Sequence, residues 1–128
     1  MSSLKKQKSF KDLGEIANQL RRRIIETGAN SKIPHLGSCL SCLDLLVYIY
    51  WNELEIDTLK PNDIKRDRFL LSKGHGAPAL FQVLAERGFF EKERLLEFGQ
   101  PGSVFHEHPP KPGLIPGIEA ATGSLGHG

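Results

Sequence analysis

The sequence predicts an α/β fold, and three neighbouring features support this prediction. Residues 69–71, Phe-Leu-Leu, form a short apolar run with the length of a buried strand. Residues 72–76, Ser-Lys-Gly-His-Gly, break the pattern as a tight turn. Pro78 then marks the first turn of a helix that ends at Gly88. A strand, a turn and a helix in this order indicate parallel strands flanked by helices.

The glycine-rich turn is a candidate anion site. Two glycines allow the backbone to approach a ligand closely, and the N-terminus of the following helix favours negative charge. Lys73 and His75 stand at this point in the sequence. A phosphate group is therefore one expected ligand, although strand–turn–helix units without any ligand are common and such a turn alone is a weak signal.

The first part of the domain is predicted to be helical. Residues 1–9 read as a disordered basic tail, and residues 10–128 as one incomplete domain. Apolar residues from Phe10 to Ile25 recur at helical spacing and predict an amphipathic helix that ends near Gly28. A loop over residues 28–37 follows and contains His35.

A second helix is predicted from Leu40 to Trp51. It is apolar nearly all round, so we expect it to be buried. The hydroxyls of Ser38 and Ser41 are the expected caps of its first turn. The Cys-x-x-Cys pair on that turn has the spacing of a redox pair, but no other part of a thioredoxin motif accompanies it. We interpret both thiols as small core side chains.

The remaining chain is rich in loops. Residues 52–66 form a polar connection, and residues 91–98 a short helix. Residues 100–117 contain five prolines and read as a long loop, of the kind that often carries function in a compact domain. This loop holds His106 and His108, and a second glycine-rich turn ends the sequence. The prolines are Pro101, Pro109, Pro110, Pro112 and Pro116.

Composition excludes several classes of protein. The 128 residues are 39% hydrophobic and 25% charged, which is ordinary for a globular protein. No apolar run approaches ~18 residues, so no membrane span is expected. The N-terminus lacks the apolar core of a secretory signal, which favours a cytoplasmic location. The basic excess of the first 32 residues lacks interleaved aromatic residues, so we expect a solvated helix face rather than nucleic-acid binding.

Three segments, taken in order, resemble the N-terminal part of transketolase. Residues 35–46 resemble its His-x-Gly segment and the following helix, and residues 67–76 its Asp-Arg-Phe-x-x-Ser-x-Gly-His segment. Residues 107–109 and 116–128 resemble its His-Pro and Gly-x-Leu-Gly-x-Gly segments. The resemblance is greatest to the short N-terminal subunits of split transketolases, and it implies an incomplete thiamine-diphosphate-binding domain.

The resemblance implies a role for each matched residue. His75 would contact the cofactor diphosphate, and Gly123, Ser124 and Leu125 would line the cofactor. His35 and His108 would act on the sugar substrate as catalytic groups, because ketol transfer moves protons to and from hydroxyls and imidazole both donates and accepts them. His106 competes with His108 for this role. Pro109 follows His108 as it does in the family, so we choose His108.

The family also implies what must be supplied from outside these residues. It binds thiamine diphosphate with Mg²⁺, and its metal ligands fall beyond residue 128, so no metal ligand is assigned here. We therefore expect sugar or sugar-phosphate substrates, a dimer or higher assembly, a partner comprising the remaining transketolase segments or a C-terminal subunit, and no activity without these additions. Three alternatives remain. They are a deoxyxylulose-phosphate-synthase-like carboligase, a non-catalytic remnant or interaction subunit, and a small metal-binding protein using His106, His108 and His127.

Overall fold

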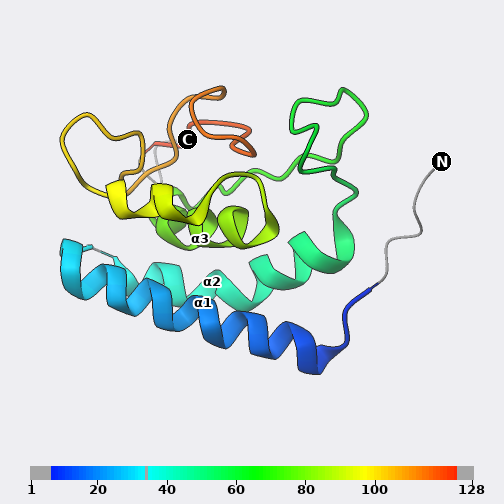
Figure 1. Ribbon diagram of the computed structural model, residues 1–128, viewed down its shortest axis with the longest axis horizontal. Helices are drawn as coiled ribbons and strands as arrows, with labels where there is room; N and C mark the ends of the chain where they lie inside the picture. Colours follow the sequence, from blue (N-terminus) through cyan, green and yellow to red (C-terminus); the bar gives the residue numbers. More distant parts are fainter. Residues whose placement is uncertain (1–6, 34, 124–128) are drawn as a thin grey trace.

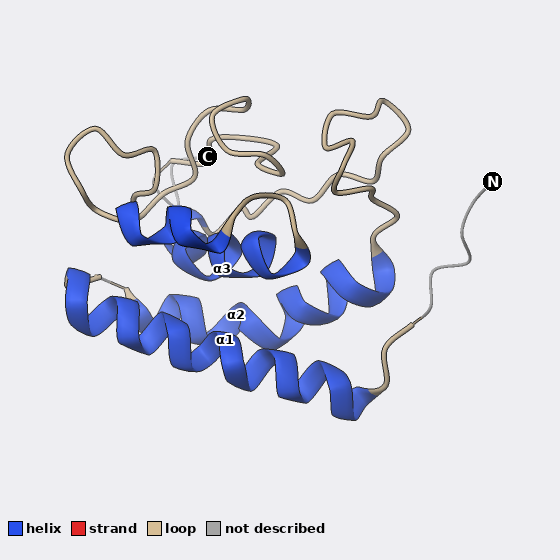
Figure 2. Ribbon diagram, viewed as in Figure 1, coloured by secondary structure: helices blue, strands red, loops and turns tan. Residues whose placement is uncertain are grey.

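The computed structural model describes residues 7–33 and 35–123, which form helices joined by long irregular segments (Figure 1). Helices α1 (Phe10–Ser31) and α2 (Leu36–Tyr48) run antiparallel and pack side by side. Helix α3 (Ala77–Arg87) packs against both. The irregular segments pass over the other side of α3 (Figure 2). Because α3 lies between the helix pair and the loops, every residue from Ala77 to Ala85 is buried.

Helix α1 follows the predicted amphipathic pattern but is longer than predicted. The side chain of Ser9 caps it by accepting a hydrogen bond from the amide of Asp12 at 3.1 Å. The helix continues past Gly28 to Ser31 and ends at Lys32, whose φ is 50°. The expected disorder of residues 1–9 does not extend to Lys8, whose backbone exchanges two hydrogen bonds with the Asn52 side chain. Residues 1–6 lie outside the described part.

Helix α2 begins earlier than predicted and is capped differently. Its N-cap residue is His35, in the left-handed region with φ 62°. The prediction that Ser38 and Ser41 cap the helix was wrong, because both lie inside it and the Ser41 hydroxyl donates to the Ser38 carbonyl at 3.2 Å. A π-helical turn, η1 (Ile49–Glu53), continues the helix. The predicted burial on all sides is also wrong at Leu45, which is 63% exposed.

No described residue belongs to a β-strand, so the expected parallel strands are not observed. Residues 69–71 form neither helix nor turn, and their backbone groups make no hydrogen bond with other described residues. A parallel strand exists only beside a second strand reached through a crossover connection. The described residues supply no second strand, which is the physical reason for the difference.

The predicted turn and the helix after it are confirmed. A single 3₁₀ turn, η2 (Gly74–Gly76), leads directly into α3, and Gly88 ends α3 with φ 103°. The predicted short helix is the 3₁₀ segment η3 (Lys92–Glu97). Residues 100–117 form the expected loop, held to the core by Phe105, whose ring packs edge-on against Phe81 at 5.3 Å. Within the described ranges, no helix combines the length and apolar character needed to cross a bilayer.

Candidate functional site

Three histidines from distant parts of the sequence meet at the η2 turn. His75 lies on this turn, with its ring centroid 4.4 Å from that of His35 and 4.8 Å from that of His108. His35 comes from the N-terminus of α2, and His108 from the long loop. His106 is exposed and makes no ring contact with this row in the described part of the chain. The structure thus brings together the three histidines that sequence reasoning selected.

Gly74 lets the C-terminal segment approach the row. A Cβ atom at this position would lie 2.6 Å from Oγ1 of Thr122 and 2.9 Å from the carbonyl oxygen of Gly123. It would also lie 3.4 Å from Cδ2 of His108. Only glycine fits such an approach without displacement, so residues 122–123 rest directly on the turn beside His75.

Two buried polar atoms at this place lack a hydrogen-bond partner. Among the described residues, buried side-chain atoms without a partner occur at Gln82, His108 (Nε2) and Thr122 (Oγ1). The last two flank Gly74, as its contacts show. Because about 90% or more of buried polar groups in proteins are hydrogen-bonded, two such atoms at one place make it a candidate binding site.

The turn itself uses its amides differently from the prediction. Those of Gly74, Gly76 and Ala77 bond to the carbonyls of Ser72, Lys73 and Gly74, so they are not free anion donors. Lys73 also departs from its expected place at the anion site. Its ammonium group donates to the Ser38 carbonyl at 2.7 Å and to the Ser41 hydroxyl at 2.8 Å, and thereby fastens the turn to α2.

The two thiols lie beneath the turn as core side chains. Cys39 is fully buried, and its thiol lies 3.7 Å from the His75 carbonyl oxygen, to which it donates. Burial raises the pKa of both the Cys39 and Cys42 thiols, and the positive charge of Lys73 opposes the rise only in part. A raised pKa disfavours the reactive thiolate, in agreement with the interpretation of both as core residues.

Some expected site residues lie outside the described part of the chain. Ser124 and Leu125, expected to line a cofactor, belong to this group, and so does His127 from the metal-binding alternative. In residues 7–33 and 35–123, no cluster of three or more His, Cys, Asp or Glu side chains is arranged to hold a metal ion. Sequence reasoning missed Thr122, because a threonine in a glycine-rich segment gives no signal of burial.

Comparison with known proteins places this chain in a family. Residues 14–128 match the family model described as transketolase, thiamine diphosphate binding domain. The chain is 41% identical over 108 residues to an apulose-4-phosphate transketolase subunit of Phocaeicola vulgatus, a match that covers 84% of this chain and 38% of that protein. Mouse transketolase is 35% identical over 123 residues, covering 95% of this chain and 19% of the mouse protein.

A solved structure shares the fold of the chain. The chain superimposes on transketolase from Leishmania mexicana with a TM-score of 0.81 and 26% identity, covering 94% of this chain and 18% of that one. The chain therefore spans about two fifths of the split-subunit relative and less than a fifth of the full-length proteins. With the family-model match over residues 14–128, these similarities show that the chain belongs to the transketolase family, as the N-terminal part of its thiamine-diphosphate-binding domain.

Proposed function

We propose that this chain forms one wall of the active site of a transketolase-like enzyme, which transfers a two-carbon ketol unit between sugars or sugar phosphates. The observation that carries the proposal is the row of three imidazoles, in which Nε2 of His108 is buried and unpaired, together with the unpaired Oγ1 of Thr122 at the same place. A row of proton-transferring groups next to unsatisfied hydrogen-bonding atoms suits a site that binds a polar cofactor and a polyhydroxylated substrate.

The residues around Gly74 fit thiamine diphosphate as the ligand. His75 would contact its diphosphate, Gly123 would present backbone to it, and Ser124 and Leu125 would complete this side. The unpaired Oγ1 of Thr122 and the unpaired Nε2 of His108 support such a fit. When bound, the cofactor supplies the electron sink for the cleaved carbon–carbon bond. Mg²⁺ would hold the diphosphate through ligands outside this chain.

His35 and His108 would handle the protons of the sugar hydroxyls. His35 is exposed at the start of α2, where a substrate can reach it. Nε2 of His108 is buried and unpaired, so it is free to bond a substrate hydroxyl. Imidazole side chains in general both accept and donate protons near neutral pH. Ketol transfer needs both steps, because protons move to and from the sugar hydroxyls.

The remainder of the domain would complete the fold as well as the site. Leu70 is 57% exposed within residues 69–71, whose backbone has no hydrogen-bonded partner in the described chain. We infer that the remaining transketolase segments, in the same polypeptide or in a C-terminal subunit, supply parallel strands that pair there. The working enzyme would then be a dimer or higher assembly in the cytoplasm, and this chain alone would be inactive.

The sugar substrate differs between relatives. One relative is named for apulose 4-phosphate, and another, 38% identical over 117 residues, is the 6-deoxy-6-sulfo-D-fructose transketolase subunit of a Clostridium strain. These names belong to those proteins. For this chain the proposal is limited to the class of sugars and sugar phosphates, and a product assay with several donors would separate ketol transfer from carboligation of the deoxyxylulose-phosphate-synthase type.

The test replaces one imidazole at a time in the completed assembly. His75→Ala should weaken thiamine diphosphate binding, measured by titration, more than it raises the substrate KM. His35→Ala and His108→Ala should lower turnover by about 10²–10⁴-fold with cofactor binding nearly intact. His106→Ala is the matched control, because His106 lies in the same loop but is exposed. Wild-type behaviour of all three site variants, or damage only in the control, would refute the proposal.

A further inference from the structure

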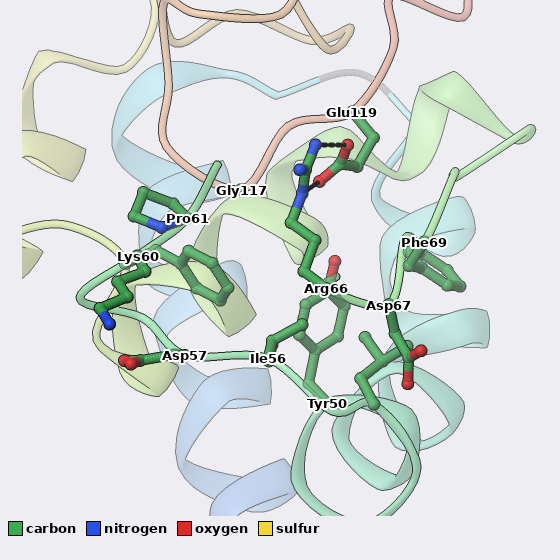
Figure 3. A pocket seen from close by; sticks show the side chains of 12 residues that line it. Tyr50, Ile56, Asp57, Lys60, Pro61, Arg66, Asp67, Phe69, Gly117 and Glu119 are labelled. Atoms are coloured by element: carbon green, nitrogen blue, oxygen red, sulfur yellow. Dashed lines mark hydrogen bonds and ion pairs between the residues drawn. The ribbon is translucent and has the colours of Figure 1, made fainter. Parts of the chain in front are cut away.

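An ion pair between Arg66 and Glu119 joins two irregular segments on the loop side of the molecule (Figure 3). The guanidinium donates through Nε to one carboxylate oxygen at 2.9 Å and through Nη2 to the other at 2.8 Å. Both side chains are largely buried, with exposed fractions of 16% and 13%. A two-point contact of this kind fixes orientation as well as distance.

The ion pair lies beside a pocket that is also lined by Tyr50, Ile56 and Phe69. Tyr50, in the π-helical turn η1, points its hydroxyl toward the guanidinium, as Figure 3 shows. Burial, and to a lesser degree the charge of Glu119, raises the pKa of this phenol, so it stays neutral. The partly open pocket that these residues line has a volume of about 10 Å³, sufficient for about one water molecule. The site therefore has no room for a substrate, and its role must be sought in the segments that it joins.

These segments lead directly to the candidate site. Glu119 precedes Thr122 and Gly123, which rest on Gly74. In the described chain, the two bonds from Arg66 to Glu119 are the only side-chain hydrogen bonds made by residues 118–123. The Arg66 side chain is itself tied to the carbonyl of Asp63 at 2.8 Å. One ion pair thus carries the polar attachment of the segment that closes the site.

We propose that Arg66 and Glu119 are positioning residues, which hold Thr122 and Gly123 against the η2 turn so that this wall of the site has its shape before a ligand binds. The contacts alone support the local geometry, whereas the effect on cofactor affinity rests on the function proposed above. A segment held in advance loses less conformational freedom on binding, and the ligand binds more tightly for that reason.

The chain offers a matched control for this pair. Arg21 and Asp44 form another two-point ion pair, in which one guanidinium nitrogen lies 2.9 Å from both carboxylate oxygens. It joins α1 to α2 on the surface, with exposed fractions of 31% and 73%, and its residues are not part of the histidine row. Removing this pair deletes the same chemical groups without touching residues 117–123.

The first experiment uses the chain itself and does not depend on the proposed function. Proton NMR should show a cross-peak between the Gly74 α-protons and the Thr122 methyl group, since Oγ1 of Thr122 lies over Gly74. We expect Glu119→Gln and Arg66→Met to abolish it, and Asp44→Asn to retain it. Arg66→Lys keeps the positive charge but loses the two-point contact, so it should weaken the cross-peak. This variant replaces the others in the test if they do not fold. A full-strength cross-peak in folded Glu119 and Arg66 variants would overturn the inference.

The second experiment measures thiamine diphosphate affinity in the completed assembly. Because the freed segment must then be ordered when the cofactor binds, we expect an affinity loss of about tenfold in Glu119→Gln, a smaller loss in Arg66→Lys, and no loss in Asp44→Asn. Turnover at saturating cofactor should fall much less, which separates positioning from general damage. If the wild-type assembly fails to bind the cofactor, the proposed function is wrong. If it binds and the Glu119 variant binds equally well, the positioning role is wrong.

Discussion

Replacing Gly74 by alanine tests whether residues 122–123 rest on the η2 turn. Gly74 does not have a positive φ, so an alanine is compatible with the local backbone. Where a new residue fits its backbone conformation, Gly→Ala stabilises a protein by about 0.4–1 kcal/mol, through the unfolded state. The sign of the result therefore depends on what the added methyl group meets.

The methyl group meets two kinds of obstacle. Thr122 Oγ1, at 2.6 Å, belongs to a side chain that can rotate away, although it is buried. The carbonyl oxygen of Gly123, at 2.9 Å, belongs to the backbone and must retreat by about 0.5 Å to reach an ordinary contact of 3.4 Å. Overpacking of this kind costs about 1–3 kcal/mol. The cost exceeds the gain, so we expect a net loss of about 1–2 kcal/mol in the free energy of unfolding.

Urea unfolding followed by circular dichroism measures this difference. Gly14→Ala is the control, because Gly14 lies inside α1 and a Cβ there would meet nothing within 4 Å. That variant should gain up to about 1 kcal/mol from helix propensity. If Gly74→Ala were stabilised like the control, residues 122–123 would not rest on the turn, and the geometry of the site would have to be revised.

Three further predictions concern charge, thiols and completeness. Hydrogen bonds from Lys92 and Arg23 outweigh the effect of burial and hold the pKa of Glu86 below its ordinary value. The resulting stabilisation is present above about pH 4.3 and is lost as the pH falls further. Urea unfolding at a series of pH values should therefore show that Glu86→Gln destabilises the chain at pH 7 and does so progressively less below about pH 4.3. Iodoacetamide should modify half-buried Cys42 before fully buried Cys39, as mass spectrometry of the digested chain would show; the reverse order would contradict the placement of α2. Calorimetry of the 128 residues alone with thiamine diphosphate and Mg²⁺ should detect weak binding or none, and tight stoichiometric binding would refute the need for further segments.

Local signals predicted that the three helices exist, and they set both ends of α3 because those ends depend on nearby residues. Pro78 and Gly88 set the limits of α3, as their backbone preferences require. The end of α1 was misplaced because Gly28 is also a tolerable helix residue. The hydrogen bonds of Lys73 to α2 could not be predicted, since they join residues more than 30 positions apart.

The site was predictable only in part, for a related reason. His35, His75 and His108 were selected through a family resemblance, and the structure gathers them without showing what each does. The ion pair of Arg66 and Glu119 gave no sequence signal, because single charged residues 53 positions apart carry no periodicity. The expected strand at residues 69–71 has the right composition, but a strand is a property of a pair of segments, and composition describes one of them.

Two requirements remain unmet in the described part of the chain, and each needs a different partner. Nε2 of His108 and Oγ1 of Thr122 need polar atoms, which a cofactor or substrate supplies. Leu70, by contrast, is 57% exposed beside a groove of about 460 Å³ that Arg68 and Ile118 also line, and burying this side chain needs a protein segment. A cofactor alone would satisfy the first requirement and leave the second, while a partner segment alone would do the opposite. We therefore expect each to increase the affinity for the other, because the segment orders the loop that carries the polar atoms and the cofactor orders the same loop from the site side.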